Sequence, residues 1–168
     1  MLIQVQNVIH RKDCAKAKGK PYMLLDIKEI LDLQGLKLCK CCKEQYKEMV
    51  YTYNIKQKYE EYVGFLKQSA LEYGFTLTIR DNDDVEIATN IEKWIIHIVQ
   101  FCGEGTAKIV LYHKNNLLFK HSVKCGSSIY PEYHIQFKDT LLPTDIVTYV
   151  AKHEQGKWGV STAKTERI

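Results

Sequence analysis

The sequence predicts an α+β protein with three parts: a small N-terminal module, a helical connector, and an antiparallel sheet domain that ends in a helix. Three observations lead to this class. Residues 1–45 hold a cluster of cysteines, residues 46–74 repeat apolar side chains at steps of three and four, and residues 75–168 change to a period of two. These three ranges are the expected domains.

The N-terminal module is predicted from a metal-ligand frame. A His-x3-Cys pair is followed, after 24 intervening residues, by a Cys-x2-Cys pair. Two sulfurs at the second spacing reach adjacent corners of a tetrahedron, which suits Zn²⁺. So few residues bury little apolar area, and a structural zinc, worth about 10–16 kcal/mol in finger peptides, would supply the deficit. The expected ligands are His10, Cys14, Cys39 and Cys42, with a set that uses Cys41 left open.

The six cysteines could instead form disulfides in a secreted protein, or be inert thiols. The first residues do not show a basic start followed by an apolar run, so no signal peptide is expected. No apolar run approaches the length of a membrane span. We therefore expect a cytoplasmic protein with reduced thiols and no membrane partner.

Short elements are expected within the module. Residues 4–9 are predicted to form a strand that delivers His10. Asp26 and Glu29 have the spacing of a capping box, so they predict the start of a short helix, and Gly35 is a suitable end.

The connector is predicted to be helical from Lys43 to Tyr73. Its apolar positions recur at helical spacing, with a break near Thr52, a second start capped by Asn54, and an end at Gly74. The tyrosines of this stripe are expected to pack in the core rather than to stack on bases.

The last domain is predicted to be a meander of antiparallel strands. Residues 75–80 and 85–88 form a hairpin around an acidic turn, and the apolar run 94–101 is typical of a buried central strand. Further strands are expected at 108–113, 117–123 and 133–138. A final helix is predicted to begin at Pro143 and to end near Gly156.

Positive charge is concentrated at the N-terminus. Residues 1–50 contain ten Lys or Arg and six Asp or Glu, whereas the remaining stretches balance. Folding around a metal would gather these cations into a local positive field. A solvated lysine surface is the commoner outcome for such a run, and contact with nucleic-acid phosphates is the functional alternative. The residues expected to contact DNA or RNA are Arg11, Lys12, Lys16, Lys18, Lys40 and Lys43.

The first 45 residues resemble the zinc-binding module of the Ada DNA-repair protein family. The resemblance rests on residues 8–16 and on residues 35–43, which contain a glycine and a Cys-Lys-x-Cys knuckle. In that family the first ligand is a cysteine that accepts a methyl group from DNA. Here the position is His10, and an imidazole cannot replace an activated thiolate. The resemblance therefore implies a compact structural zinc module that faces DNA, without methyl transfer.

Catalysis is not expected. The weaker alternative is a metal-assisted nuclease, in which His113 would act as the base with Asn115 or His134 as partners. The leading hypothesis is a zinc-binding accessory protein that contacts nucleic acid. A further alternative is a phage or mobile-element protein, of the anti-CRISPR or anti-defence type, that binds a host protein.

Overall fold

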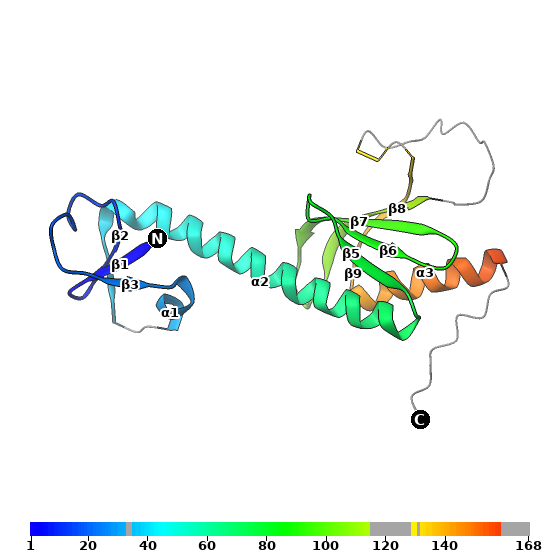
Figure 1. The fold of residues 1–168 in the computed structure, drawn as a ribbon, viewed down its shortest axis with the longest axis horizontal. Coiled ribbons are helices and arrows are strands. Elements are labelled where there is room, and N and C mark those ends of the chain that lie inside the picture. The colour runs from blue at the N-terminus through cyan, green and yellow to red at the C-terminus, as the bar shows by residue number, and fades with distance from the viewer. Residues whose placement is uncertain (33–34, 115–128, 131, 159–168) are drawn as a thin grey trace, which may run out of the picture. The chain divides into compact units, whose positions relative to one another are not determined.

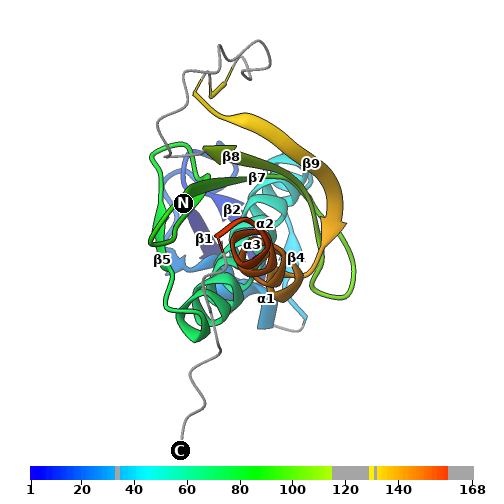
Figure 2. The same cartoon turned by 90° about the vertical axis from the view of Figure 1, so that its right-hand side faces the viewer.

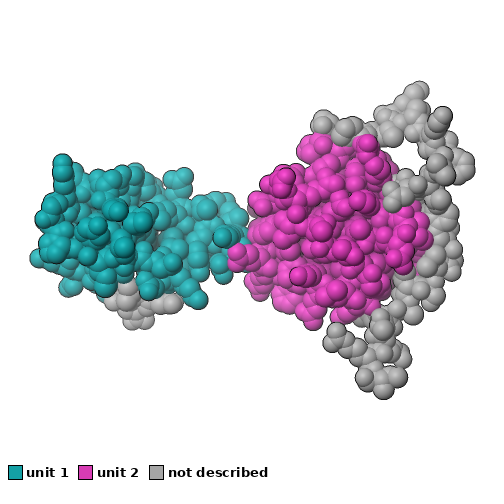
Figure 3. All heavy atoms as spheres, in the orientation of Figure 1, with its two compact units in different colours: residues 1–57 teal, residues 58–168 magenta. Residues whose placement is uncertain are grey.

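The protein combines helices and strands in two compact units, residues 1–57 and 58–168 (Figure 3). The structure is a computed structural model that describes residues 1–32, 35–114, 129–130 and 132–158. The predicted α+β class is confirmed. The strand expected at 117–123 and the candidate residue Asn115 lie outside the described residues.

Unit 1 contains a four-stranded sheet in the order β3-β1-β2-β4, of which Figure 1 labels β1, β2 and β3. Strands β1 (Leu2–Val5) and β2 (Val8–Arg11) form an antiparallel hairpin. Strand β3 (Met23–Leu25) pairs antiparallel with β1, and β4 (Lys37–Leu38) pairs parallel with β2. The sheet therefore places β3 and β4, which are distant in sequence, on opposite sides of the β1-β2 hairpin.

The single strand expected at residues 4–9 is wrong. The chain turns at Gln6, whose φ is 53°, and returns as β2. Tight hairpin turns require positive φ and usually show it through Asn-Gly or Asp-Gly. This turn is Gln6-Asn7, which carries neither signature, so the sequence did not indicate it.

Helix α1 (Ile27–Asp32) has the predicted capping box. The Lys28 amide donates to the Asp26 carboxylate at 2.8 Å, and the Asp26 amide donates to the Glu29 carboxylate at 2.9 Å. Each side chain thus satisfies a backbone donor that the first turn leaves without a helical partner.

Helix α2 (Lys43–Glu72) is continuous for 30 residues, so the break expected near Thr52 is wrong. The Thr52 hydroxyl donates to the Glu48 carbonyl at 2.9 Å, which satisfies its polar group inside the helix. The helix ends at Glu72, two residues before the glycine that was predicted to close it. Gly74 adopts φ 72°, a left-handed conformation that favours glycine after a helix.

Unit 2 is a five-stranded antiparallel sheet whose spatial order follows the chain, with one long helix after it. A bulge near Ile98 interrupts the third strand. The final helix continues past Gly156, so its expected end there was slightly early. The elements are β5 (Thr76–Ile79), β6 (Val85–Ala88), β7 (Lys93–Phe101), β8 (Ala107–Lys114), β9 (His134–Leu141) and α3 (Pro143–Trp158).

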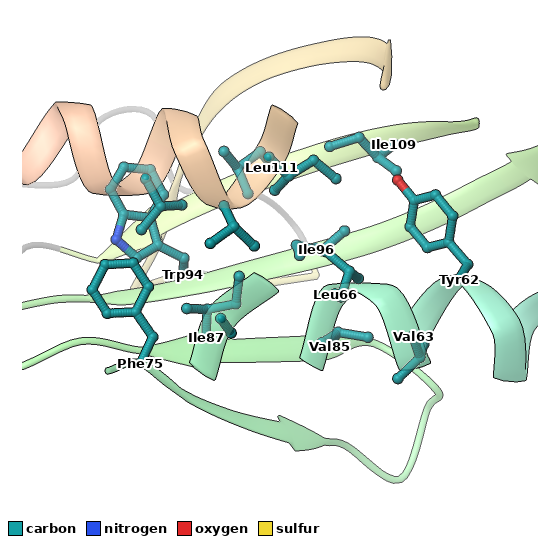
Figure 4. Close-up of a cluster of buried hydrophobic side chains, with 14 of the residues drawn as sticks. Tyr62, Val63, Leu66, Phe75, Val85, Ile87, Trp94, Ile96, Ile109 and Leu111 are labelled. Carbon is teal, nitrogen blue, oxygen red and sulfur yellow. The ribbon is translucent and has the colours of Figure 1, made fainter. Parts of the chain in front are cut away.

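The main core of unit 2 lies on one face of this sheet, where the second half of α2 and α3 both pack (Figure 2). Leu66 of α2, Trp94 of β7 and Ile146 of α3 are fully buried in it. Figure 4 shows Trp94 and Leu66 among the side chains of this cluster. The prediction that 94–101 is buried throughout is wrong for its second half, because Val99 is 53% exposed beyond the bulge.

The opposite face of the sheet carries a smaller aromatic cluster and a charged group. Glu86 of β6 forms salt bridges with Arg80 and with Lys93, the latter at 3.1 Å. Burial acts to raise the pKa of Glu86, but these two cations outweigh it and lower the pKa below its ordinary value. Among the described helices, none combines the length and the apolar character that a membrane crossing needs.

Candidate metal centre

The four residues of the predicted frame converge in unit 1. His10 lies on β2, and Cys14 follows in the turn after it. Cys39 immediately precedes the short 3-10 helix η1 (Lys40–Cys42), which leads into α2, and Cys42 is the last residue of η1. One ligand atom of each lies within 4.8 Å of those of the other three, and all four residues are buried. The group could therefore hold one metal ion.

Backbone hydrogen bonds hold these segments in place. The Cys39 amide donates to the Ile9 carbonyl at 3.0 Å, so the parallel pairing of β2 and β4 places Cys39 beside His10. The Cys42 amide donates to the Cys39 carbonyl at 2.9 Å, which closes the Cys-x2-Cys turn. The Cys14 amide donates to the Arg11 carbonyl at 3.0 Å. The site is thus shaped by the backbone as well as by any ion.

The electrostatics of the group favour a thiolate at Cys14. The hydrogen bond with His10, whose Nδ1 lies 3.4 Å from the Cys14 sulfur, is the main cause that lowers the pKa of Cys14 to about 6. Burial raises the pKa of Cys42, although the Arg11 amide points at its sulfur from 3.4 Å and acts in the opposite direction. Because only a thiolate ligates a metal, the lowered pKa prepares Cys14 for one.

Cys41 lies at the rim of the group. Its sulfur is 3.1 Å from that of Cys39 and 3.4 Å from that of Cys14, yet the residue is exposed. Hydrogen bonds, first to Cys39 and then to Cys14, raise the pKa of Cys41 to about 12. These contacts favour the protonated thiol at Cys41. A ligand set that includes it stays a prediction.

The six cations expected at a nucleic-acid surface all lie within four residues of a ligand. Arg11 is half-buried and forms a salt bridge with Asp13, whereas the five lysines are exposed. Four residues of chain span at most about 14 Å, so the convergence of the ligands also limits the separation of these cations.

The structure also brings together two of the three residues considered for a nuclease. His113 of β8 and His134 of β9 are cross-strand partners, with 3.2 Å between His113 Nδ1 and His134 Nε2. Sequence reasoning missed the residues that lie on the other side of His113, namely Glu92 and His153, which form with it a second group able to hold a metal. No local spacing indicates this group, because its members come from three separate elements.

Comparisons of this chain with protein-family models, with curated proteins and with solved structures found no match.

Proposed function

We propose that unit 1 is a zinc-stabilised module that contacts nucleic acid through the cations around its metal centre. The observation that carries the proposal is the buried His10, Cys14, Cys39 and Cys42 group, with exposed lysines immediately beside its ligands. The resemblance of residues 1–45 to the Ada zinc module supports a surface that faces DNA.

Zinc is the ion that best suits this donor set. Three thiol sulfurs and one imidazole nitrogen match a common structural zinc ligation. In a tetrahedral zinc site a sulfur and a nitrogen ligand are about 3.6 Å apart, given the usual bond lengths. The 3.4 Å between His10 Nδ1 and the Cys14 sulfur is close to that value. When bound, the zinc would tie β2 to the segment before α2.

Charge supports a polyanionic partner. Unit 1 contains 11 Lys or Arg and 6 Asp or Glu, a net charge of +5, whereas unit 2 contains 13 and 14, a net charge of −1. Lys43 begins α2, where the helix dipole is already positive and a cation does not stabilise the helix. Cations at such a position contribute more to an external positive field than to folding.

The test is a salt series of binding to labelled DNA and RNA oligonucleotides, measured by fluorescence anisotropy. The variant replaces four cations with alanine: Arg11, Lys12, Lys16 and Lys18. We expect weaker binding across all sequences, and a salt slope that falls by about one unit per lost phosphate contact.

A matched control separates this surface from net charge. It replaces four exposed lysines of unit 2 with alanine: Lys58, Lys67, Lys108 and Lys138. This control should bind nucleic acid as the parent protein does. Unchanged affinity in the unit 1 variant, with its metal still bound, would refute the proposal and favour a protein partner.

A further inference from the structure

We propose that Glu92, His113 and His153 form a second metal site, in unit 2, which binds one divalent transition-metal ion such as Zn²⁺. One ligand atom of each residue lies within 4.8 Å of the other two. Two imidazoles and one carboxylate are a ligand set that zinc and other first-row metals use. The inference concerns unit 2 alone and does not depend on nucleic-acid binding by unit 1.

Three separate segments deliver these ligands to the core face of the sheet. Glu92 immediately precedes β7, His113 lies near the end of β8, and His153 lies on α3. The Glu92 Oε2 atom contacts His113 Nε2 and lies 3.8 Å from His153 Nδ1. In a tetrahedral site, oxygen and nitrogen ligands lie about 3.3 Å apart, so small side-chain shifts suffice to coordinate one ion.

The burial of these side chains favours binding of a cation. The side chains of Glu92 and His113 are 0% exposed, and that of His153 is 16% exposed. A carboxylate removed from water costs free energy unless positive charge or hydrogen bonds compensate it. A divalent ion supplies that charge at the point where the three ligand atoms meet.

The Glu92 ligand is positioned by a turn that is itself anchored to α3. The Thr89 hydroxyl accepts from the Glu92 amide at 2.9 Å, and the Thr89 amide donates to the Glu92 carbonyl at 3.0 Å. The same hydroxyl donates to the carboxylate of Glu154, the residue after His153. The turn and the helix thus hold two ligands in a fixed relation, as a metal site needs.

The His113 ligand is held on both of its sides. Its ring stacks on Trp94, its cross-strand neighbour, with 3.9 Å between the ring centroids. Its Nδ1 lies 3.2 Å from His134 Nε2. His134 Nε2 also lies 3.1 Å from the Gln136 side-chain oxygen, so His134 supports the His113 ring on the side away from Glu92. His134 is therefore a positioning residue in this proposal, not a ligand.

Three protein ligands leave one tetrahedral position for water or another small ligand. The imidazoles of His113 and His153 are 5.0 Å apart between centroids, and their rings are inclined at 76°. In the proposed site the divalent ion lies between these two rings. This second site has no sulfur ligand, whereas the site in unit 1 has three, so an experiment that detects sulfur ligation distinguishes the two sites.

The experiment measures metal stoichiometry and cobalt spectra of the full chain. Protein equilibrated with Zn²⁺ and desalted should contain two zinc ions per chain. Reloading with Co²⁺ should give intense sulfur-to-cobalt charge-transfer absorption for the first equivalent. The second equivalent should give only weak visible bands, because it has nitrogen and oxygen ligands.

Two variants remove the second site in different ways. His153→Ala deletes a ligand, and Glu92→Gln removes the anionic charge while keeping the volume of the side chain. Both should bind one zinc per chain with the cobalt–thiolate band unchanged. His97→Ala is the matched control, because His97 lies on β7 and pairs with Asp84 away from the cluster. It should keep two ions.

Wild-type protein that binds one ion, with cobalt bands of the thiolate type alone, would overturn the proposal and leave the cluster as a hydrogen-bonded network. Retention of the second ion in Glu92→Gln and His153→Ala would overturn it as well. Near-UV circular dichroism checks that each variant is folded. If His153→Ala is unfolded, the wild-type stoichiometry and Glu92→Gln still decide the outcome.

Discussion

Replacing Cys42 with serine should release the metal of unit 1 and unfold this unit, whereas replacing Cys41 should do neither. Cys42 is 3% exposed and belongs to the buried four-residue group, while Cys41 is exposed at its rim. A serine hydroxyl has nearly the shape of the thiol but is a poor ligand for zinc. The pair of variants therefore tests ligation with little change in packing.

The expected loss of stability is large because unit 1 has a small apolar core. Apart from the ligands, its two apolar clusters contain seven buried residues in the part of the chain described. A structural zinc contributes about 10–16 kcal/mol in small modules. This equals or exceeds the net stability of a whole domain, about 5–15 kcal/mol. Loss of the ion should therefore unfold unit 1 completely and should not merely lower its melting temperature.

The assay combines the cobalt–thiolate absorption with amide hydrogen exchange. In Cys42→Ser the absorption should be lost and the amides of β1 and β2 should exchange as in an unfolded chain, while those of β7 and β8 stay protected. Cys41→Ser should match the wild type in both. A Cys42→Ser protein with bound metal and protected β2 amides would refute this reasoning, and loss of metal in Cys41→Ser would make Cys41 a ligand.

Three further predictions concern unit 2. Leu66→Ala should lower the free energy of unfolding of unit 2 by about 2–5 kcal/mol in denaturant titrations, because Leu66 is fully buried in the core; a loss below 1 kcal/mol would contradict this packing. Tyr62→Phe should lower the free energy of unfolding in the same titrations by about 0.5–1.5 kcal/mol, because the Tyr62 hydroxyl donates to the Leu141 carbonyl at 3.0 Å. An unchanged free energy of unfolding would show that this hydrogen bond does not stabilise the protein. The pKa of Glu86 is lowered by folding, so its contribution to stability is present above the ordinary value of 4.5 and is lost as pH falls through the folded pKa. In Glu86→Gln the melting temperature should therefore fall less steeply with decreasing pH in this acidic range. An unchanged pH dependence would contradict this prediction.

The sequence predicted those elements whose structure is determined by residues close together in the chain. The capping box at Asp26 and the glycine at 74 each satisfy backbone groups of their own helix end, so the residues that decide the structure are neighbours in sequence. The alternation of residues 75–88 is likewise set by the two faces of one hairpin. The turn at Gln6 departs from this rule, since its left-handed φ is imposed on a residue that does not favour it.

The two candidate metal sites also differ in how far they could be predicted from local sequence. The first group was predicted as a frame because its cysteines occur as a short motif, and the structure brings them into one buried group with His10. Glu92 and His153 are 61 positions apart in the sequence and meet only because α3 packs against the sheet. The sequence indicated Asn115 or His134 as partners of His113 and did not connect it with Glu92 or His153. Tertiary packing alone creates the second group.

The order of strands in unit 2 has a consequence for how this unit folds. Each strand pairs with the next one along the chain, from β5 to β9, so most contacts are short in sequence and low contact order favours rapid folding. Helix α3 is the last described element to be synthesised, and its Tyr149 and His153 cover Trp94 edge-on. Docking of α3 therefore completes the burial of Trp94.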